Sequence, residues 1–242
     1  PRSTLFPYTT LFRSPWPPPR MAADGIATLR IDFMGNGDST ASYRDYNYTS
    51  AVIDAKAAAD YLAGLETVDG GNLGVMGWSQ GGTDALLAAE AHPDTFQAVV
   101  TWSGALELNG ASLFAGTSFE DAYAQAKKEG FYTMTFDWRE PLELGERWFQ
   151  EVAETNILKV TADIKAPILA INGKDDTTVT PDNAEKIVKA AANADSQLLL
   201  VDNCDHTYNV FSGDFTALYQ TVDATAAFFQ AQLIPAAAQA AA

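Results

Sequence analysis

Short apolar runs alternate with amphipathic stretches along most of the chain. Five runs are bounded by turn-forming residues and have the length of buried strands: Ile26–Phe33, Leu73–Gly77, Gln97–Trp102, Pro167–Asn172 and Gln197–Val201. Apolar side chains recur at helical spacing in other segments: Thr49–Leu62, Gly82–Ala91, the residues after Thr180-Pro181, and Leu218–Phe229. Because neighbouring parallel strands need crossover connections, this alternation predicts an α/β domain whose mostly parallel sheet is covered by helices on both faces.

One segment, about residues 104–160, departs from this alternation. Its pattern is helical and rich in aromatic residues, and it contains no run of strand quality to match the other five. We therefore expect a helical cap inserted over one edge of the sheet. Some of its rings could line a substrate pocket, but at least half of them are needed for the core of the insertion itself.

The first twenty residues differ in composition from everything that follows them. They contain six of the eleven prolines and three arginines but no acidic residue, and the triplet TLF occurs twice. The stretch RSTLFPYTTLFRS resembles translated sequencing-adapter sequence, and the alternative is a genuine proline-rich disordered tail. The sequence therefore predicts a non-native or disordered tail over residues 1–20 and a folded domain over residues 21–242.

Composition and charge exclude several classes of protein. The chain carries 15 lysines and arginines against 31 aspartates and glutamates, a formal net charge of −16, so nucleic acids and anionic membrane surfaces would repel it. No apolar stretch approaches the length of a membrane helix. The single cysteine, Cys204, excludes an internal disulfide, and two histidines are too few for a typical metal site built from histidines.

The segment Gly77-Trp78-Ser79-Gln80-Gly81 matches the pattern G-x-S-x-G between a predicted strand and a predicted helix. In that context the serine stands on a sharp turn, and the flanking glycines relieve steric crowding. The start of the helix directs free N–H groups toward an oxyanion forming at Ser79, and the backbone N–H of Gln80 is one such donor. The alternative interpretation is a small-residue turn with an idle serine.

A serine hydroxyl becomes a nucleophile only when a base and an orienting acid assist it. His206 follows the last predicted strand and Asp176 follows the fourth, so both lie where open α/β sheets place their sites. The alternative base is His92, at the end of the helix after the serine, and the alternative acid is Asp175. Asp205 adjoins His206 in sequence, and we expect it to be a loop or capping residue.

From Ile26 to about Leu233 the chain resembles the α/β-hydrolase superfamily. Four motifs carry the resemblance: IDFMGNGDS at Ile31–Ser39, GWSQGG at Gly77–Gly82, GKDDTTV at Gly173–Val179 and CDHTY at Cys204–Tyr208. The order serine, acid, histidine is that of the superfamily, and the motifs are most similar to those of bacterial cinnamoyl or feruloyl esterases and related small carboxylesterases. The resemblance implies Ser79 as nucleophile, His206 as base, Asp176 as orienting acid, an acyl-enzyme, and no metal or organic cofactor.

The N-terminal part of the chain departs from this family. The strand that carries DFMG corresponds to the fourth of eight in the α/β-hydrolase fold, which implies that the first three strands are missing and about five are present. The loop that supplies the second oxyanion-hole donor would be missing with them. An incomplete sheet with a bare edge predicts poor solubility and leaves open whether this chain is active.

The resemblance implies hydrolysis of carboxylic esters, of the aryl or cinnamoyl type, with a small-molecule ester as partner and neither nucleic acid nor membrane. The motifs leave open a serine aminopeptidase or prolyl-oligopeptidase-like peptidase of the same fold, and an inactive fragment that acts as a binding module. Candidate substrate contacts are Trp78, Tyr132, Asp137 and Trp138. We expect a cytoplasmic location, and the oligomeric state stays open.

Overall fold

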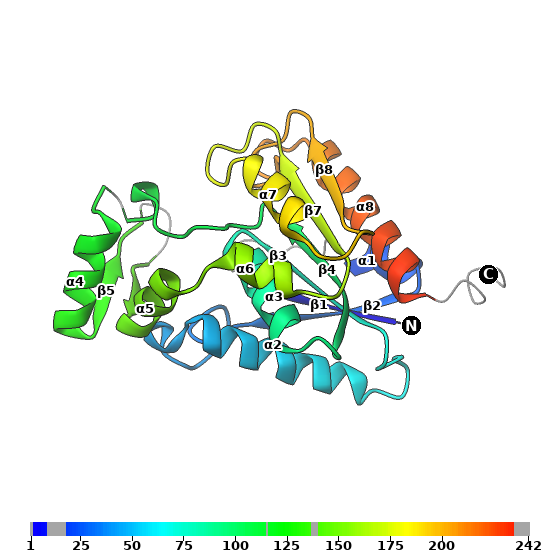
Figure 1. Cartoon of the computed structure of the whole chain (residues 1–242), viewed down its shortest axis with the longest axis horizontal. Helices are drawn as coiled ribbons and strands as arrows, with labels where there is room; N and C mark the ends of the chain where they lie inside the picture. The colour runs from blue at the N-terminus through cyan, green and yellow to red at the C-terminus, as the bar shows by residue number, and fades with distance from the viewer. Residues whose placement is uncertain (1, 9–17, 115, 137–139, 235–242) are drawn as a thin grey trace.

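A parallel sheet forms the centre of the computed structural model, which describes residues 2–8, 18–114, 116–136 and 140–234 (Figure 1). The sheet has six strands in the order β2-β1-β3-β4-β7-β8, and every neighbouring pair is parallel. The strands are β1 (Arg2–Tyr8), β2 (Ile26–Asp32), β3 (Leu73–Trp78), β4 (Phe96–Trp102), β7 (Ile168–Gly173) and β8 (Gln197–Val201). The last five confirm the strands predicted from the apolar runs.

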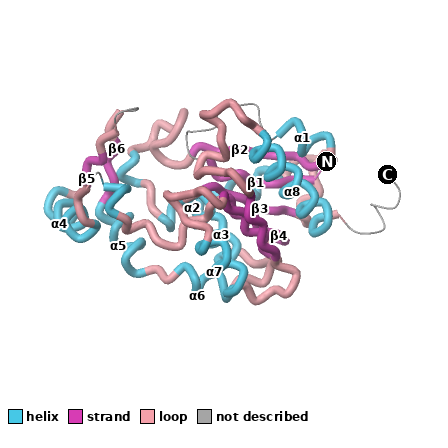
Figure 2. The backbone as a smooth tube through the Cα atoms, turned by 90° about the horizontal axis from the view of Figure 1, so that it is seen from above, coloured by secondary structure: helices cyan, strands magenta, loops and turns pink. Residues whose placement is uncertain are grey.

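Helices cover both faces of the sheet, as the alternation of elements predicts (Figure 2). Successive strand residues point to opposite faces, so Met76 and Val100 pack with α8 while their neighbours Val75 and Val99 pack with α2 and α3. The helices are α1 (Pro18–Ala23) and α8 (Thr216–Leu233) on one face, and α2 (Tyr48–Ala63), α3 (Gln80–Ala91), α6 (Ile157–Asp163) and α7 (Asp182–Ala190) on the other.

The N-terminal segment belongs to the sheet, which corrects the prediction of a tail over residues 1–20. Strand β1 lies between β2 and β3, with Leu5 aligned to Leu29 on one side and to Val75 on the other. Its threonine, phenylalanine and tyrosine residues favour strands. The sequence pattern does not predict the strand because residues 1–20 as a whole are rich in proline and contain no acidic residue, a composition typical of a tail. Helix α1 already begins at Pro18, and residues 9–17 lie outside the described residues.

The sheet therefore has one strand more than the sequence predicts. The expectation that every strand before Ile26 is missing is wrong for β1. Pairing with β1 also gives β2 its place in the sheet, because β2 is bonded to no other described strand. The similarity of RSTLFPYTTLFRS to adapter sequence concerns the origin of the segment and stays a prediction.

The insertion after β4 forms its own small unit at one end of the molecule (Figure 1). It contains the 3-10 turn η2 (Ala111–Phe114), α4 (Phe119–Glu129), β5 (Phe131–Met134), β6 (Leu142–Gly145) and α5 (Glu146–Glu154). A second 3-10 turn, η1 (Tyr43–Asp45), lies outside the insertion, between β2 and α2. The predicted helical cap is present as α4 and α5, and it also contains an antiparallel hairpin of β5 and β6 that the sequence pattern does not predict. Strands of four residues are too short to stand out in a hydrophobic pattern.

Aromatic side chains hold the insertion together. Phe114, Phe119, Trp148 and Phe149 are buried in one cluster, which also includes Phe33 from the end of β2. Most of these rings therefore form the core of the insertion and attach it to the sheet domain. None of the helices within the described ranges is both long and apolar enough to cross a membrane.

Candidate active site

A strained turn carries Ser79. Strand β3 ends at Trp78 and helix α3 begins at Gln80, so Ser79 alone makes the connection, with φ 55° and ψ −124°. A positive φ is costly for a residue with a side chain. The backbone N–H of Ser79 donates to the carbonyl of Trp102 at 2.9 Å, and its own carbonyl accepts the N–H of Gly82 at 2.9 Å, which fixes the turn.

The flanking glycines are required by close approach of the backbone. A Cβ atom at Gly77 would collide with the carbonyl oxygen of Gly81, and one at Gly82 would lie 2.7 Å from the Cα atom of Gly104. Real Cβ atoms do not approach backbone atoms this closely. Glycine is therefore needed at Gly77, where β3 meets α3, and at Gly82, where α3 meets the segment after β4. The predicted nucleophile elbow geometry is therefore present around Ser79.

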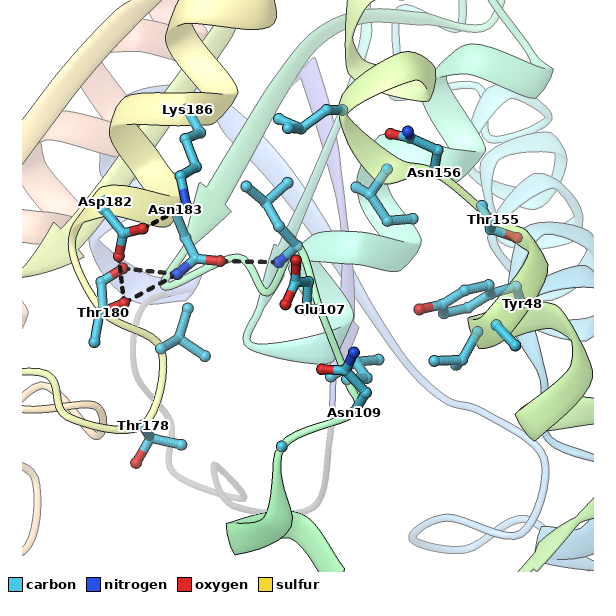
Figure 3. Close-up of a pocket in the computed structure, with 18 of the residues that line it drawn as sticks. Tyr48, Glu107, Asn109, Thr155, Asn156, Thr178, Thr180, Asp182, Asn183 and Lys186 are labelled. Atoms are coloured by element: carbon cyan, nitrogen blue, oxygen red, sulfur yellow. Dashed lines mark hydrogen bonds and ion pairs between the residues drawn. The ribbon is translucent and has the colours of Figure 1, made fainter. Parts of the chain in front are cut away.

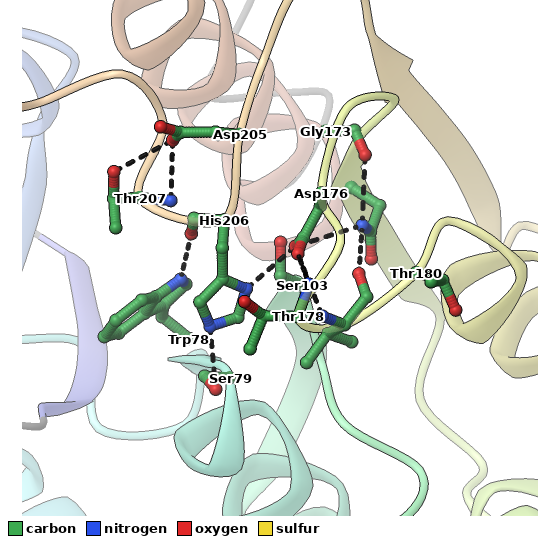
Figure 4. Close-up of polar contacts among 12 residues, drawn as sticks. Trp78, Ser79, Ser103, Gly173, Asp176, Thr178, Thr180, Asp205, His206 and Thr207 are labelled. Atoms are coloured by element: carbon green, nitrogen blue, oxygen red, sulfur yellow. Dashed lines mark hydrogen bonds and ion pairs between the residues drawn. The ribbon is translucent and has the colours of Figure 1, made fainter. Parts of the chain in front are cut away.

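His206 links Ser79 to Asp176 through hydrogen bonds (Figure 4). Its Nε2 atom lies 3.1 Å from Ser79 Oγ, and its Nδ1 atom lies 2.8 Å from Asp176 Oδ2. The His206 side chain is 15% exposed and that of Asp176 is fully buried. The structure thus brings together the three residues, which the sequence separates by up to 127 positions.

The surroundings of Asp176 favour its ionised form. Burial raises its pKa, but hydrogen bonds from His206 and the backbone, together with the charge of His206, outweigh this and lower the pKa below its ordinary value. The backbone N–H groups of Thr178 and Val179 each donate to Oδ1 at 2.9 Å. On the other oxygen, the amide of Asn172 lies 3.4 Å from Oδ2. Asp176 is therefore a carboxylate at neutral pH.

The competing candidates lie elsewhere. Asp175 is exposed, and Oδ1 of Asp205 accepts the backbone N–H groups of Thr207 and Asn209, as expected of a loop residue. His92 follows the C-terminus of α3, a helix of 12 residues that starts next to Ser79. At 1.5 Å per residue this separates the two ends by about 18 Å, too far for proton transfer.

The predicted oxyanion donor, the backbone N–H of Gln80, lies at the N-terminus of α3. Gln80 is the first residue of the helix, and the N–H groups of a first turn have no partner within the helix. The helix dipole adds positive potential at the same place. The predicted absence of a second donor concerns the segment before Ile26, of which residues 9–17 lie outside the described residues.

The predicted substrate contacts have different outcomes. Trp78 packs against His206, with ring centroids 4.9 Å apart. Tyr132 lies in β5 and packs edge-on against Phe114 in the core of the insertion. Asp137 and Trp138 lie outside the described residues.

Sequence reasoning misses the residues that surround Asp176. Ser103 follows β4, is fully buried with φ 46°, and its Oγ lies 3.3 Å from the hydroxyl of Tyr208. Asn172, near the end of β7, donates to the carbonyl of Val179 at 2.9 Å. The one signal available in the sequence is that these polar residues stand at or near the carboxyl ends of predicted strands.

A cavity of about 670 Å³ lies beside the loop that carries Asp176 (Figure 3). Three segments line it: Leu106–Gly110 after β4, Val152–Leu158 around the start of α6, and Thr178–Lys186 leading into α7. The hydroxyl of Tyr48, an otherwise buried side chain, points into it. Apolar and polar side chains both contribute to its walls. Neither here nor in the rest of the described part of the chain does a cluster of histidine, cysteine and acidic side chains occur that could hold a metal ion.

A parallel sheet with a serine on a strand–helix turn, and with an acid and a histidine after later strands, defines the α/β-hydrolase fold. Residues 12–234 match the sequence model of the prolyl oligopeptidase family, Peptidase_S9. The chain therefore belongs to the prolyl oligopeptidase family. The similarity to the α/β-hydrolase superfamily seen in the sequence is confirmed.

Individual proteins are similar to this chain in sequence or in fold. Serine hydrolase BPHL of Homo sapiens is 25% identical over 196 residues, which cover 77% of this chain and 66% of that protein, so the chain spans just under two thirds of this relative. Est1E of Butyrivibrio proteoclasticus, solved with ferulic acid, superimposes with a TM-score of 0.72 at 18% identity, covering 96% of this chain and 89% of Est1E.

A monoacylglycerol lipase of Paleococcus ferrophilus has the same fold. It superimposes with a TM-score of 0.73 at 17% identity, covering 95% of this chain and 94% of the lipase. At these identities the similarity to the two solved structures establishes the fold alone.

Proposed function

We propose that this protein is a serine hydrolase that cleaves carboxylic esters through an acyl-enzyme. The observation that carries the proposal is the continuous hydrogen-bonded chain from Ser79 through His206 to the buried carboxylate of Asp176. It stands at the carboxyl edge of a parallel sheet, and the serine lies at the start of a helix. This combination of nucleophile, base and orienting acid is what acyl transfer requires.

In the first half of the reaction, Ser79 Oγ attacks the ester carbonyl carbon while His206 Nε2 takes its proton. The negative charge that develops on the carbonyl oxygen is stabilised by the backbone N–H of Gln80 and the dipole of α3. Collapse of this tetrahedral intermediate breaks the bond to the alkoxy oxygen, which leaves as an alcohol with the proton from His206. The acyl group remains bonded to Ser79.

In the second half, water replaces the alcohol. His206 Nε2 removes a proton from the water, the resulting hydroxide attacks the acyl carbon, and a second tetrahedral intermediate forms. Its collapse releases the carboxylic acid and returns the proton to Ser79. Throughout, Asp176 stays ionised, orients the ring through Nδ1 and stabilises the imidazolium that forms twice in each cycle.

We further propose that the cavity beside Asp176 receives the part of the substrate that does not react. The apolar part of its mixed lining, which includes Leu106, Leu108 and Ile157, suits an aryl or longer acyl group. Two proteins of similar fold, Est1E with ferulic acid bound and a monoacylglycerol lipase, are consistent with such substrates. A cinnamoyl-type ester is therefore the first substrate class to test.

A peptidase is the second candidate function, because the matched family is that of prolyl oligopeptidases. The same nucleophile would then attack an amide, and His206 would protonate the leaving amine. Ester and amide substrates with the same acyl group separate these two functions.

The test compares hydrolysis of 4-nitrophenyl acetate, butyrate and cinnamate with that of aminoacyl 4-nitroanilides. The variants are Ser79→Ala and, as a control, Ser212→Ala in an exposed loop. We expect ester hydrolysis that disappears in Ser79→Ala and persists in Ser212→Ala, and a fluorophosphonate probe that labels Ser79. Cleavage of the anilides at comparable rates would favour the peptidase. Labelling or activity independent of Ser79 would exclude the proposed nucleophile, and a folded protein that cleaves neither the esters nor the anilides would favour a binding role.

A further inference from the structure

We propose that Trp78, the residue directly before the nucleophile, is a positioning residue that holds His206 in its working orientation. The proposal rests on the proposed function in so far as His206 is the base of the reaction. If Trp78 has this role, the segment around Ser79 both presents the nucleophile and holds the base that activates it.

Two contacts join Trp78 to His206 (Figure 4). The indole Nε1–H donates to the backbone carbonyl oxygen of His206 at 2.8 Å. The indole and imidazole rings also pack against each other, with centroids 4.9 Å apart and planes inclined by 39°. The first contact fixes the backbone from which the histidine side chain projects, and the second limits rotation of its ring.

The loop around His206 needs such support. It is irregular, and Asn203, Tyr208 and Asn209 have φ values of 50°, 56° and 60°, a conformation that residues with side chains rarely adopt. The hydrogen bond that His206 donates to Asp176 holds only Nδ1 and by itself allows the ring to tilt about that contact. Since a misplacement of about 1 Å can cost on the order of 10² in rate, the packing of Trp78 has a direct catalytic consequence.

The geometry favours this role over the substrate contact expected from the sequence. Trp78 is 9% exposed, and it belongs to the apolar cluster between the sheet and α8. Its indole N–H already has a partner in His206. Little of the side chain is left to meet a substrate, whereas the contact with the base is extensive.

Trp102 provides a matched control. It pairs with Trp78 in the register of β3 and β4, is 4% exposed, and belongs to the same apolar cluster. Its Nε1–H also donates one buried hydrogen bond, at 2.9 Å, but to Thr225 Oγ1 in α8 instead of His206. Replacing either tryptophan by phenylalanine thus removes one buried hydrogen bond and a similar volume, and it leaves the backbone carbonyl of Trp102 in place. Trp102 packs against Tyr208 in the loop of His206, with ring centroids 5.2 Å apart, whereas the indole hydrogen bond and the ring contact with His206 itself come from Trp78.

The kinetic test uses Trp78→Phe, Trp78→Leu and Trp102→Phe with 4-nitrophenyl acetate. We expect kcat to fall about 10-fold to 100-fold in Trp78→Phe, and further in Trp78→Leu, with KM unchanged within about 2-fold. Trp102→Phe should keep kcat within about 3-fold of the parent, although it should lower the melting temperature about as much as Trp78→Phe does. Equal losses of kcat in Trp78→Phe and Trp102→Phe would overturn the proposal, because they would reflect general packing.

A second measurement needs no activity. The chain has only two histidines, so its proton NMR spectrum contains two imidazole Hε1 signals, which His92→Gln assigns. We expect Trp78→Phe to move the His206 signal and leave the His92 signal in place, and Trp102→Phe to move neither. An unchanged His206 signal in Trp78→Phe would overturn the proposal. If esters are not hydrolysed but the His206 signal depends on Trp78, the proposed function fails and the positioning contact stands.

Discussion

Two fully buried aspartates in this protein have pKa values shifted in opposite directions, and their partners explain the difference. Asp176 receives hydrogen bonds from His206 and from two backbone N–H groups, which outweigh its burial and lower its pKa. Asp84, in α3, has the hydroxyl of Tyr46 as its partner at 2.6 Å, and its Oδ1 atom has no partner among the described residues. Burial therefore raises the pKa of Asp84 to about 7.

We predict that Asp84→Asn increases stability more at pH 8 than at pH 5. The folded state binds a proton at Asp84 more tightly than the unfolded chain does, because its pKa is raised from about 4 to about 7. The resulting stabilisation is present below the unfolded pKa and is lost as the pH rises through the folded pKa. The parent should lose about 2 to 3 kcal/mol relative to the variant between pH 5 and pH 8. Urea unfolding at both pH values measures this, and curves that stay parallel would contradict it.

We predict that Asp176→Asn lowers kcat for 4-nitrophenyl acetate by about 10³-fold to 10⁴-fold with a small effect on KM. The amide carries no charge to stabilise the imidazolium, and it can favour the wrong tautomer of His206. Asp175→Asn is the control, since Asp175 is adjacent in sequence but exposed, and it should keep kcat within about 2-fold. A large loss in Asp175→Asn would show that the acid has been assigned to the wrong residue.

The junctions between elements set the geometry of the site more than the elements themselves. Ser79 lies between β3 and α3, Asp176 lies between β7 and α7, and His206 lies between β8 and α8. Parallel strands bring these three junctions to the same edge of the sheet. The backbone at each junction therefore has little freedom, and changes there should affect both folding and activity.

We predict that Gly77→Ala destabilises the protein by about 3 kcal/mol or more, because its Cβ would meet the backbone of Gly81, which cannot move without breaking the turn. Gly64→Ala, at the C-terminus of α2, is the control. There the nearest atoms to the new Cβ lie 3.5 Å away and φ is −79°, so the variant should differ little from the parent. Thermal unfolding compares the two, and equal melting temperatures would exclude the close approach at Gly77.

We predict that Ala153→Trp, at an exposed position of α5 on the wall of the cavity, raises KM for 4-nitrophenyl cinnamate about 10-fold. The indole would occupy space that the larger acyl group needs, whereas hydrolysis of the acetate should change by less than about 2-fold. Ala57→Trp, at an exposed position of α2 away from the cavity lining, controls for the added surface indole. Equal kinetics of Ala153→Trp with both esters would place the substrate elsewhere.

The N-terminal and C-terminal parts of the chain are packed into the same domain. β1 lies between β2 and β3, while α1 and α8 pack together on one face of the sheet. The net charge of −16 opposes self-association. The stability of the whole molecule thus depends on a segment whose composition predicts a tail.

We predict that removal of residues 1–17 leaves a chain that aggregates and loses most of its stability. Without β1, strand β2 has no partner in the described sheet and the edge of β3 is bare. Removal of residues 235–242 is the control and should leave the unfolding midpoint unchanged within about 2 °C. Light scattering and urea unfolding report on both forms. A shortened chain as soluble and stable as the parent would show that β1 is not needed in the sheet.

Local pattern was sufficient for the elements and for the three central site residues. Five strands and the helices α2, α3, α7 and α8 could be located because hydrophobic period and turn residues are properties of neighbouring positions, and motifs next to these elements indicated Ser79, Asp176 and His206. The chain order of nucleophile, acid and base then follows from the order of the strands. The sequence favours Asp176 but leaves Asp175 open, since both follow the same strand, and the structure separates the two by the burial of Asp176 and its hydrogen bond with His206.

The remaining features depend on residues that are far apart in the chain. Strand β1 can be identified only from its pairing with β2 and β3, because the neighbours of a parallel strand come from segments that are distant in the sequence. Trp78 and His206 are 128 residues apart, and nothing near either residue predicts their contact. The cavity beside Asp176 is likewise formed by three segments from different parts of the chain. Periodicity along the sequence reports which side of an element is buried, but packing alone decides which elements meet there.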